Sequence, residues 1–215
     1  MATIVCYGDS NTWGCVPMKE RGLPERFSAT ERWAGVLREQ LGAGHTVIEE
    51  GLNGRTTCLD DPIEGLHKNG LKHLPVVLES HAPFDLLIIK LGTNDLKYRL
   101  SMTPGDIADG AGLMVDLAKS TLLPPEGKPP AVLLISPAPL VDLTWLGEMF
   151  TGGKEKSLGL AREMERVAKD RGVAFLDAGK IVTSSPVDGI HLDREDHLKL
   201  GTAVAASVRE ILPGV

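Results

Sequence analysis

Three residues suited to acyl transfer stand at opposite ends of this chain. Ser10 closes the tripeptide Gly8-Asp9-Ser10 directly after a short apolar run, and Asp188 and His191 lie three residues apart near the C-terminus. Serine is a poor nucleophile unless a neighbouring base takes its proton, and a neutral imidazole can take that proton and return it to the leaving group. An aspartate that accepts the second ring N–H fixes the tautomer and stabilises the imidazolium. The spacing therefore predicts a catalytic triad of Ser10, Asp188 and His191.

Two motifs in the middle of the chain offer hydrogen-bond donors for a developing negative charge. Gly54 follows the segment Gly51-Leu52-Asn53, and Asn94 follows Gly92-Thr93. The tetrahedral intermediate of acyl transfer needs preorganised donors around its oxygen. We expect an oxyanion hole made of the backbone N–H groups of Ser10 and Gly54 and the side-chain amide of Asn94.

The residues beside these motifs have weaker signals. Asn11 follows the nucleophile directly, so its polar side chain is a candidate for contact with the acyl group. Trp13 is a candidate pocket wall, and an aromatic residue at the start of a first helix is equally typical of a core. Asp9 and Asp95 are expected to accept loop hydrogen bonds rather than to take part in the reaction.

Alternating strands and helices are predicted to position these residues. Runs rich in β-branched and apolar residues recur at positions 3–7, 46–50, 85–91, 131–136 and 173–177. Helical spacing of apolar residues follows at 31–41, 71–81, 104–121, 154–171 and 194–212, with Ser28 and Glu31 as a possible capping box for the first helix. Strands that are apolar at nearly every position need cover on both faces, as in a parallel sheet between helices. The sequence therefore predicts an α/β fold, a three-layer α/β/α sandwich with a five-stranded parallel sheet and flavodoxin-like strand order.

The predicted topology brings the chemical motifs together. Ser10 follows the first strand, Gly54 the second and Asn94 the third, while Asp188 and His191 follow the fifth. Ligands of open α/β sheets bind outside the carboxyl ends of the strands, so all four segments are expected at one edge. Four long connections also stand out, at 16–29, 59–70, 122–130 and 137–153. We expect the second and the fourth to form the walls of the site.

Composition limits the class of protein. The chain has 215 residues, of which 42% are hydrophobic and 24% charged, and these values are typical of one soluble globular domain over residues 1–215. A net charge of -6 without a basic stripe argues against nucleic acid as a partner, and no apolar stretch is long enough to span a membrane. Three cysteines without metal or redox spacing, and an N-terminus without a secretion signal, favour the cytoplasm.

Together the four motifs resemble the sequence blocks of the SGNH (GDSL-type) hydrolases, in the same order along the chain. Residues 7–14, 49–57, 91–95 and 187–191 look most like the bacterial arylesterase branch of that family. The resemblance implies a serine esterase for short-chain aryl or alkyl esters, possessing acyltransferase or perhydrolase activity as well, and it implies no cofactor. It also implies a homo-oligomer, with an octamer as the leading candidate. One position departs from the family pattern, because Asn11 stands where leucine is usual.

Other functions compete with this interpretation. The same triad and oxyanion hole serve a carbohydrate deacetylase, a lysophospholipase or a thioesterase, since the fold does not choose the acyl group. A non-catalytic flavodoxin-like module that binds phosphate is disfavoured, because the loop after the first strand lacks a Gly-x-Gly-x-x-Gly fingerprint. A metal site drawn from Asp188, His191, Asp193 and His197 is disfavoured as well, because its spacing matches no known ligand motif. No metal is therefore expected.

Overall fold

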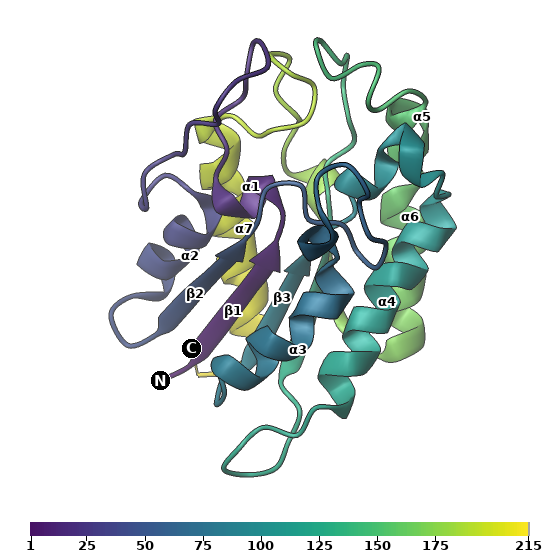
Figure 1. Cartoon of the computed structure of the whole chain (residues 1–215). Helices are drawn as coiled ribbons and strands as arrows, with labels where there is room; N and C mark the ends of the chain where they lie inside the picture. The colour runs from purple at the N-terminus through teal and green to yellow at the C-terminus, as the bar shows by residue number, and fades with distance from the viewer. Residues whose placement is uncertain (215) are drawn as a thin grey trace.

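Five parallel strands form the centre of the molecule in the computed structural model, which describes residues 1–214. They are β1 (Thr3–Gly8), β2 (Thr46–Gly51), β3 (Leu86–Lys90), β4 (Ala131–Ser136) and β5 (Ala174–Asp177). Their order across the sheet is β2-β1-β3-β4-β5, and each neighbouring pair is parallel (Figure 1). The predicted flavodoxin-like order is confirmed, and each observed strand overlaps a predicted one.

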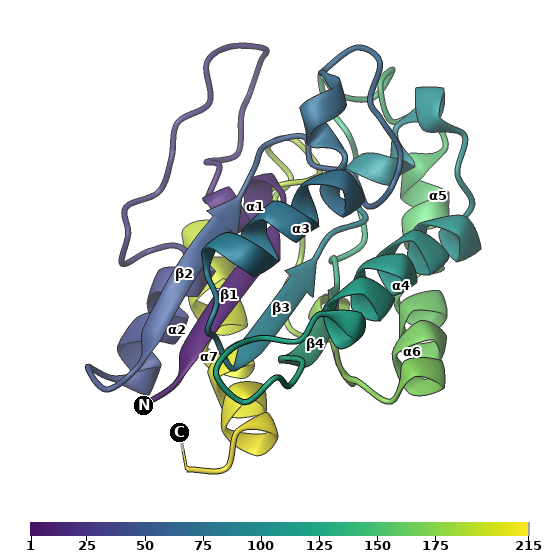
Figure 2. The same cartoon turned by 60° about the horizontal axis from the view of Figure 1, so that its bottom comes forward.

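Helices cover both faces of this sheet. One face is covered by α2 (Trp33–Leu41) and α7 (Arg194–Ile211), which pack against each other. The other face is covered by α3 (Gly70–Ser80), α4 (Pro104–Ser120) and α6 (Leu160–Arg171). Figure 2 shows α3 crossing in front of the sheet and α7 behind it. The three-layer prediction is therefore confirmed.

Strand β1 shows why its sequence must be apolar on both sides. Val5 and Tyr7 lie in the core beneath α3 and α4, whereas Ile4 and Cys6 lie in the core beneath α2 and α7. All four side chains are fully buried. Successive side chains of a strand point to opposite faces, so a strand covered on both faces has no position left for water.

The first predicted helix starts later than expected. The Glu31 carboxylate does accept the Ser28 N–H at 2.9 Å, but the Ser28 hydroxyl pairs with the Thr30 hydroxyl instead of capping a helix. These residues close a turn, and α2 begins at Trp33 without a side-chain cap. The predicted capping box is therefore wrong.

The helix predicted at 154–171 is two helices, α5 (Gly153–Ser157) and α6. The chain turns between them at Gly159, which lies against Pro104 so closely that a Cβ would come within 3.1 Å of the proline ring. Helical periodicity continues through this segment and hides the break. The predictions for α3, α4 and α7 agree with the structure to within one residue at each end.

The loops that follow the strands gather at one end of the sheet, at the top of Figure 1. Within residues 1–214 no helix is both long and apolar enough to cross a membrane. Across the same residues, no three or more His, Cys, Asp and Glu side chains gather as a metal ion would require.

Candidate active site

Ser10 lies where β1 ends and the short helix α1 (Ser10–Trp13) begins. Asp9 caps this helix, because its Oδ1 accepts the Asn11 N–H at 3.0 Å, and this confirms its expected structural role. Gly8 allows α1 to fold back closely onto the strand, since a Cβ there would lie 2.1 Å from the Thr12 hydroxyl oxygen. The turn presents Ser10 at the carboxyl edge of the sheet.

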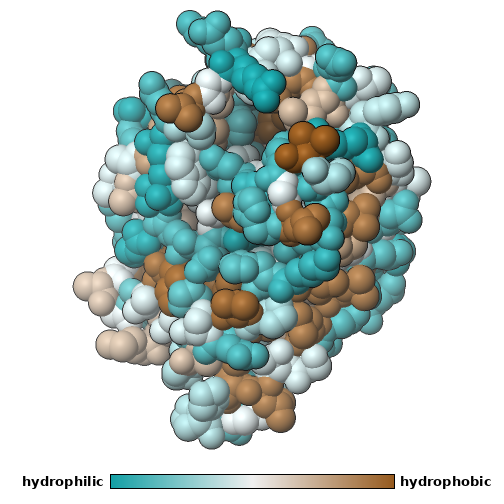
Figure 3. All heavy atoms as spheres, viewed as in Figure 1, coloured by the Kyte–Doolittle hydropathy of each residue, from teal (hydrophilic) through white to brown (hydrophobic). Residues whose placement is uncertain are grey.

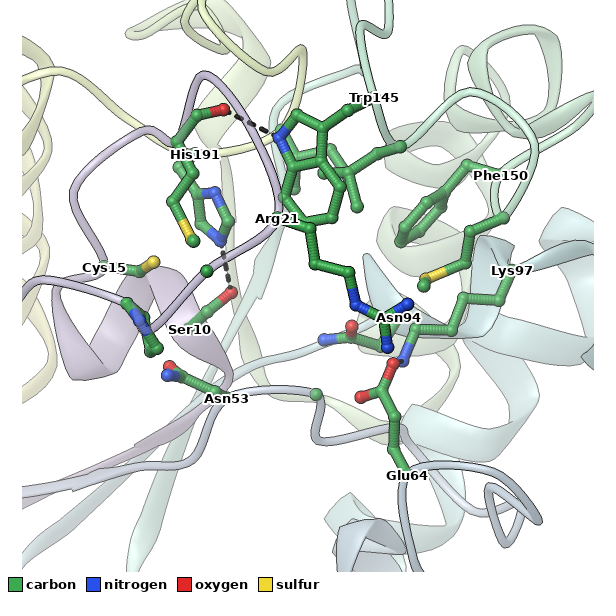
Figure 4. Close-up of a pocket in the computed structure, with 17 residues that line it drawn as sticks. Ser10, Cys15, Arg21, Asn53, Glu64, Asn94, Lys97, Trp145, Phe150 and His191 are labelled. Atoms are coloured by element: carbon green, nitrogen blue, oxygen red, sulfur yellow. Dashed lines mark hydrogen bonds and ion pairs between the residues drawn. The ribbon is translucent and has the colours of Figure 1, made fainter.

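The structure brings Ser10, Asp188 and His191 into one hydrogen-bonded row. Ser10 Oγ lies 3.0 Å from His191 Nε2 (Figure 4). His191 Nδ1 lies 2.7 Å from Asp188 Oδ2. All three residues are buried. With Nδ1 donating to the carboxylate, the neutral ring has its lone pair on Nε2, facing the serine hydroxyl. The arrangement can move a proton from the serine to the imidazole.

Asp188 is held by four donors. Its Oδ1 accepts the backbone N–H groups of Ile190 and His191 at 3.0 and 2.9 Å, and its Oδ2 accepts the Met18 N–H at 2.8 Å in addition to the His191 ring. Burial acts to raise the pKa of Asp188, but the hydrogen bonds and the charge of His191 outweigh it and hold this pKa below its usual value. The carboxylate therefore remains ionised beside the imidazole.

The environment of His191 acts on its pKa in two directions. Burial lowers the pKa of the imidazole, whereas the hydrogen bond to Asp188 and the nearby Cys15 sulfur raise it. The net effect is a pKa above the ordinary value of 6.5. A ring with this environment is a stronger proton acceptor than a free histidine.

Three donors surround the space next to Ser10 Oγ. Gly54 and Asn94 line the same pocket as Ser10 and His191. Within residues 1–214, the backbone N–H groups of Ser10 and Gly54 make no hydrogen bond to the protein. Asn94 Nδ2 donates one hydrogen to the Arg55 carbonyl at 3.1 Å, which fixes the amide and leaves its second hydrogen available. Gly54 has a φ of 80° and lies against Glu64, so a side chain would be strained there.

Asp95 holds the loop beneath these donors, as expected. Its carboxylate accepts the Thr57 N–H at 2.9 Å and the Thr57 hydroxyl at 2.6 Å. Burial raises the pKa of Asp95 to about 6 despite these bonds. The side chain points into the protein and is absent from the pocket lining.

The pocket in front of Ser10 has a volume of about 320 Å³. One wall is apolar and is formed largely by the segment after β4, with Trp145, Leu146, Met149 and Phe150. Trp145 Nε1 donates to the Met18 carbonyl at 2.8 Å, so this wall is tied to the loop after α1 (Figure 4). The expected role of the connection 137–153 as a wall is confirmed.

A charged wall, which sequence reasoning missed, lies beside this apolar one. Lys97 is buried and donates to Glu64 Oε1 at 2.6 Å and to Asp61 Oδ2 at 3.1 Å. Arg99 also binds Asp61, through two bonds of 3.0 and 2.6 Å. These pairs fix the connection 59–70 against the segment after β3, which confirms that connection as a wall through Glu64. The partners lie more than 30 residues apart, so no local sequence signal links them.

Asn11 and Trp13, the two predicted substrate-binding residues, do not line the pocket. Asn11 is buried away from the pocket, where its amide donates to the Ile190 carbonyl at 3.3 Å and accepts the Leu192 N–H at 3.0 Å. Its polar side chain therefore ties the nucleophile turn to the histidine loop and does not contact the substrate space. Trp13 is half-buried, packs against Arg26 and is also absent from the lining.

The connection 16–29 was not expected to form part of the site, yet it covers the pocket. Its contribution consists of Met18, Arg21, Gly22 and Pro24. This connection contains no regular element, so neither periodicity nor capping signals indicate its path. Figure 4 shows Arg21 reaching across the space toward Asn94.

A family model decides where the chain belongs. The model of the GDSL-like lipase/acylhydrolase family matches residues 6–203, nearly the whole chain. The chain belongs to this family. No curated protein matches it significantly.

Solved structures of family relatives agree with this assignment. The native aryl esterase of M. smegmatis is 42% identical, with a TM-score of 0.95 over 99% of this chain and 100% of that one. A carbohydrate acetylesterase from Sinorhizobium meliloti is 39% identical, with the same TM-score and coverage. Another carbohydrate acetylesterase family member from that organism is 37% identical, with a TM-score of 0.91 over 99% of each chain. The present protein is thus an esterase of the GDSL family with the α/β fold of these relatives.

Proposed function

We propose that the protein hydrolyses short-chain acyl esters through an acyl-enzyme on Ser10. The observation that carries this proposal is the row from Ser10 Oγ through His191 to Asp188, with separations of 3.0 and 2.7 Å. His191 takes the hydroxyl proton as Ser10 Oγ attacks the ester carbonyl, and then returns it to the departing alcohol oxygen. A water molecule repeats the sequence on the acyl-enzyme, releasing the acid and restoring Ser10.

The negative charge of both tetrahedral intermediates falls on the former carbonyl oxygen. We assign its stabilisation to the Ser10 and Gly54 backbone N–H groups and to the Asn94 amide, which lie around the same space. Donors fixed before the reaction need no reorganisation as the charge develops. Asn94 is fixed by Arg55, and Gly54 by the turn whose φ only glycine accepts readily.

The shape of the pocket favours a small acyl group. Phe150 and Trp145 line the 320 Å³ space together with the ion pair of Lys97 and Glu64, in which Lys97 is buried and Glu64 is partly exposed. We expect kcat/KM on p-nitrophenyl esters to be highest for acetate and to fall steadily toward octanoate. A series from acetate to octanoate at constant protein concentration measures this directly, and an optimum at octanoate would instead support the lysophospholipase or thioesterase alternative.

A carbohydrate ester is the second candidate substrate. Its support is the combination of an indole face at Trp145 with the polar groups of Arg21, Asn53 and Glu64 around one pocket, an arrangement that suits a hydroxylated ring. The S. meliloti relatives carry the name of this activity. Release of acetate from acetylated sugars, compared with p-nitrophenyl acetate at equal concentration, separates the two candidates.

We also propose that the protein is a homo-oligomer, with an octamer as the leading candidate. Several large apolar side chains are exposed near the pocket mouth, with Leu23 at 94%, Ile63 at 76% and Tyr98 at 66%. Figure 3 shows hydrophobic residues scattered among hydrophilic ones on the side of the molecule seen in Figure 1. An assembly that narrows the entrance would favour alcohols or peroxide over water as acyl acceptor, and this supports acyltransferase or perhydrolase activity.

The free cysteines Cys6, Cys15 and Cys58 support a cytoplasmic location.

The rate is expected to rise with pH through an acid limb above pH 6.5. His191 must be neutral to accept the Ser10 proton, and its raised pKa means that the neutral form becomes populated only above the ordinary histidine range. The profile of kcat/KM from pH 5 to 10 measures the midpoint, with circular dichroism confirming that the fold persists. A midpoint at or below 6.5 would contradict the raised pKa.

A further inference from the structure

A buried lysine lies directly behind the nucleophile turn and has no part in the mechanism described above. Lys90 is the last residue of β3 and is paired in the sheet with Gly8, the residue before Asp9. It follows Ile88 by two positions, and Ile88 lies in the core beneath α2 and α7. The Lys90 side chain therefore points to that same face, and it is only 1% exposed.

Three buried polar atoms, two in the turn that carries Ser10 and one on α7, have no partner in the protein. Within residues 1–214, Asp9 Oδ2, Thr12 Oγ1 and His197 Nε2 are buried without a hydrogen bond. Thr12 stands over Gly8 on the face of the sheet toward which Lys90 points, since a Cβ at Gly8 would lie 2.1 Å from Thr12 Oγ1 and 2.9 Å from the Lys90 carbonyl oxygen. Buried polar atoms without partners are costly, and proteins satisfy them with ordered water when the surroundings are polar.

The protonation state of His197 determines whether its Nε2 donates a hydrogen bond to such a water or accepts one. His197 Nδ1 accepts the Trp33 N–H at 3.2 Å, so a neutral ring carries its hydrogen on Nε2. Burial and then the charge of Lys90 lower the pKa of His197 to about 3, so the ring is neutral in the working range. The site thus offers a donor at His197, an acceptor at Asp9 and a hydroxyl at Thr12 that serves as either.

Lys90 and Asp9 carry opposite charges whose effects on each other reach across this part of the core. Asp9 is fully buried, and burial lowers the pKa of Lys90 while the Asp9 charge acts to raise it. No direct ion pair joins the two residues in the described part of the chain, so a hydrogen-bonded connection between them would need a bridging group. Arg55 is the other cation whose charge interacts with Asp9; its Nη1 donates to the Gly8 and Glu50 carbonyls and its guanidinium lies over the Tyr7 ring, while its Nε has no partner within residues 1–214.

We propose that Lys90 is a positioning residue for the reaction, which neutralises the Asp9 carboxylate through ordered water bound between Asp9, Thr12, Lys90 and His197. The network holds the cap of α1, and thereby the orientation of Ser10 toward His191. The proposal rests on Ser10 being the nucleophile, as assigned above. Lys90 touches neither substrate nor the reacting atoms.

A double-mutant cycle with Lys90→Met and Asp9→Asn tests this role. Asparagine keeps the oxygen that caps α1, and methionine fills the space of the lysine stem, so each single variant leaves one buried charge without its counterpart. On p-nitrophenyl acetate, we expect each single variant to lower kcat about tenfold with KM changed less than about twofold. The double variant should recover to within about threefold of wild type, because neither charge remains. Lys169→Met, on the exposed side of α6, is the control for loss of a lysine.

The outcomes separate this proposal from the proposed function. Additive losses in the double variant, or wild-type kcat in Lys90→Met, would overturn the role of Lys90 while leaving the triad intact. Turnover by Ser10→Ala would overturn the triad regardless of the cycle. If Lys90→Met does not fold, a high-resolution crystal structure of the wild-type protein decides: water within hydrogen-bonding distance of Asp9 Oδ2 and Lys90 Nζ is expected, and a dry Asp9 carboxylate refutes the network.

Discussion

Replacement of Ser10 by alanine is expected to lower kcat on p-nitrophenyl acetate by roughly 10⁴-fold or more. The variant loses the atom that attacks the carbonyl, while the oxyanion donors and the pocket remain. The fold should be unaffected, because the Ser10 side chain makes its hydrogen bond to His191 and supports no other element. Steady-state rates and thermal unfolding of the two proteins, purified in parallel, provide the measurement.

A matched control for this change is Ser120→Ala, at the exposed end of α4, which removes a hydroxyl that bonds only to the Leu117 carbonyl. Its rate should equal that of wild type. Full turnover by a folded Ser10→Ala protein would show that another residue is the nucleophile. A phosphonate ester that reacts with active serines should label the wild type and the control but not Ser10→Ala.

Asp188→Asn is expected to lower kcat by about 10⁴-fold, with little change in KM. Asparagine has one acceptor oxygen where the aspartate uses both, and its amide can donate to His191 Nδ1. That bond would place the ring hydrogen on Nε2, which then faces Ser10 and cannot accept its proton. Hydrogen bonds from Met18 and Ile190 to the carboxylate would also weaken.

Asp193→Asn is the appropriate control for Asp188→Asn, since it lies in the same segment, before α7, and makes no side-chain cap. It should retain the wild-type rate. If kcat of Asp188→Asn fell by less than tenfold, the carboxylate would contribute only to the structure of the loop. Measuring both variants with acetate and butyrate esters shows whether the loss is independent of the acyl group, as an effect on the base requires.

The sheet and the hydrogen-bonded row of Ser10, His191 and Asp188 were predictable from sequence, because both follow from local rules. Apolar runs such as residues 86–89 identify buried strands, and parallel topology places the residue after each strand at one edge. Ser10, Gly54 and Asn94 therefore fall together without any knowledge of long-range packing. Spacing also places Asp188 beside His191, since a tight turn brings residues three positions apart into contact.

The pocket was predictable only in part, because its walls depend on contacts between distant segments. Lys97 pairs with Asp61 across 36 residues, and the Trp145 indole bonds to Met18 across 127. Such pairs leave no periodic pattern. For Asn11 the prediction was wrong in the other direction. Its position next to Ser10 in the sequence suggested that it contacts the substrate, but its amide binds the histidine loop instead. Lys90 falls inside the predicted strand 85–91 without a signal of its own, and only the sheet register places it beside Gly8, the residue before Asp9.

One oxygen connects substrate binding to proton transfer. Asp188 Oδ2 accepts both the His191 ring and the backbone N–H of Met18, and the Met18 carbonyl in turn accepts the Trp145 indole. A ligand that displaces Met18 therefore weakens one donor to that oxygen and increases its hold on the imidazolium. Substrate preference is thus coupled to the basicity of the His191 imidazole. Redesign of the loop for a bulkier ester will shift the pH profile along with the selectivity unless the Met18 N–H is kept in place.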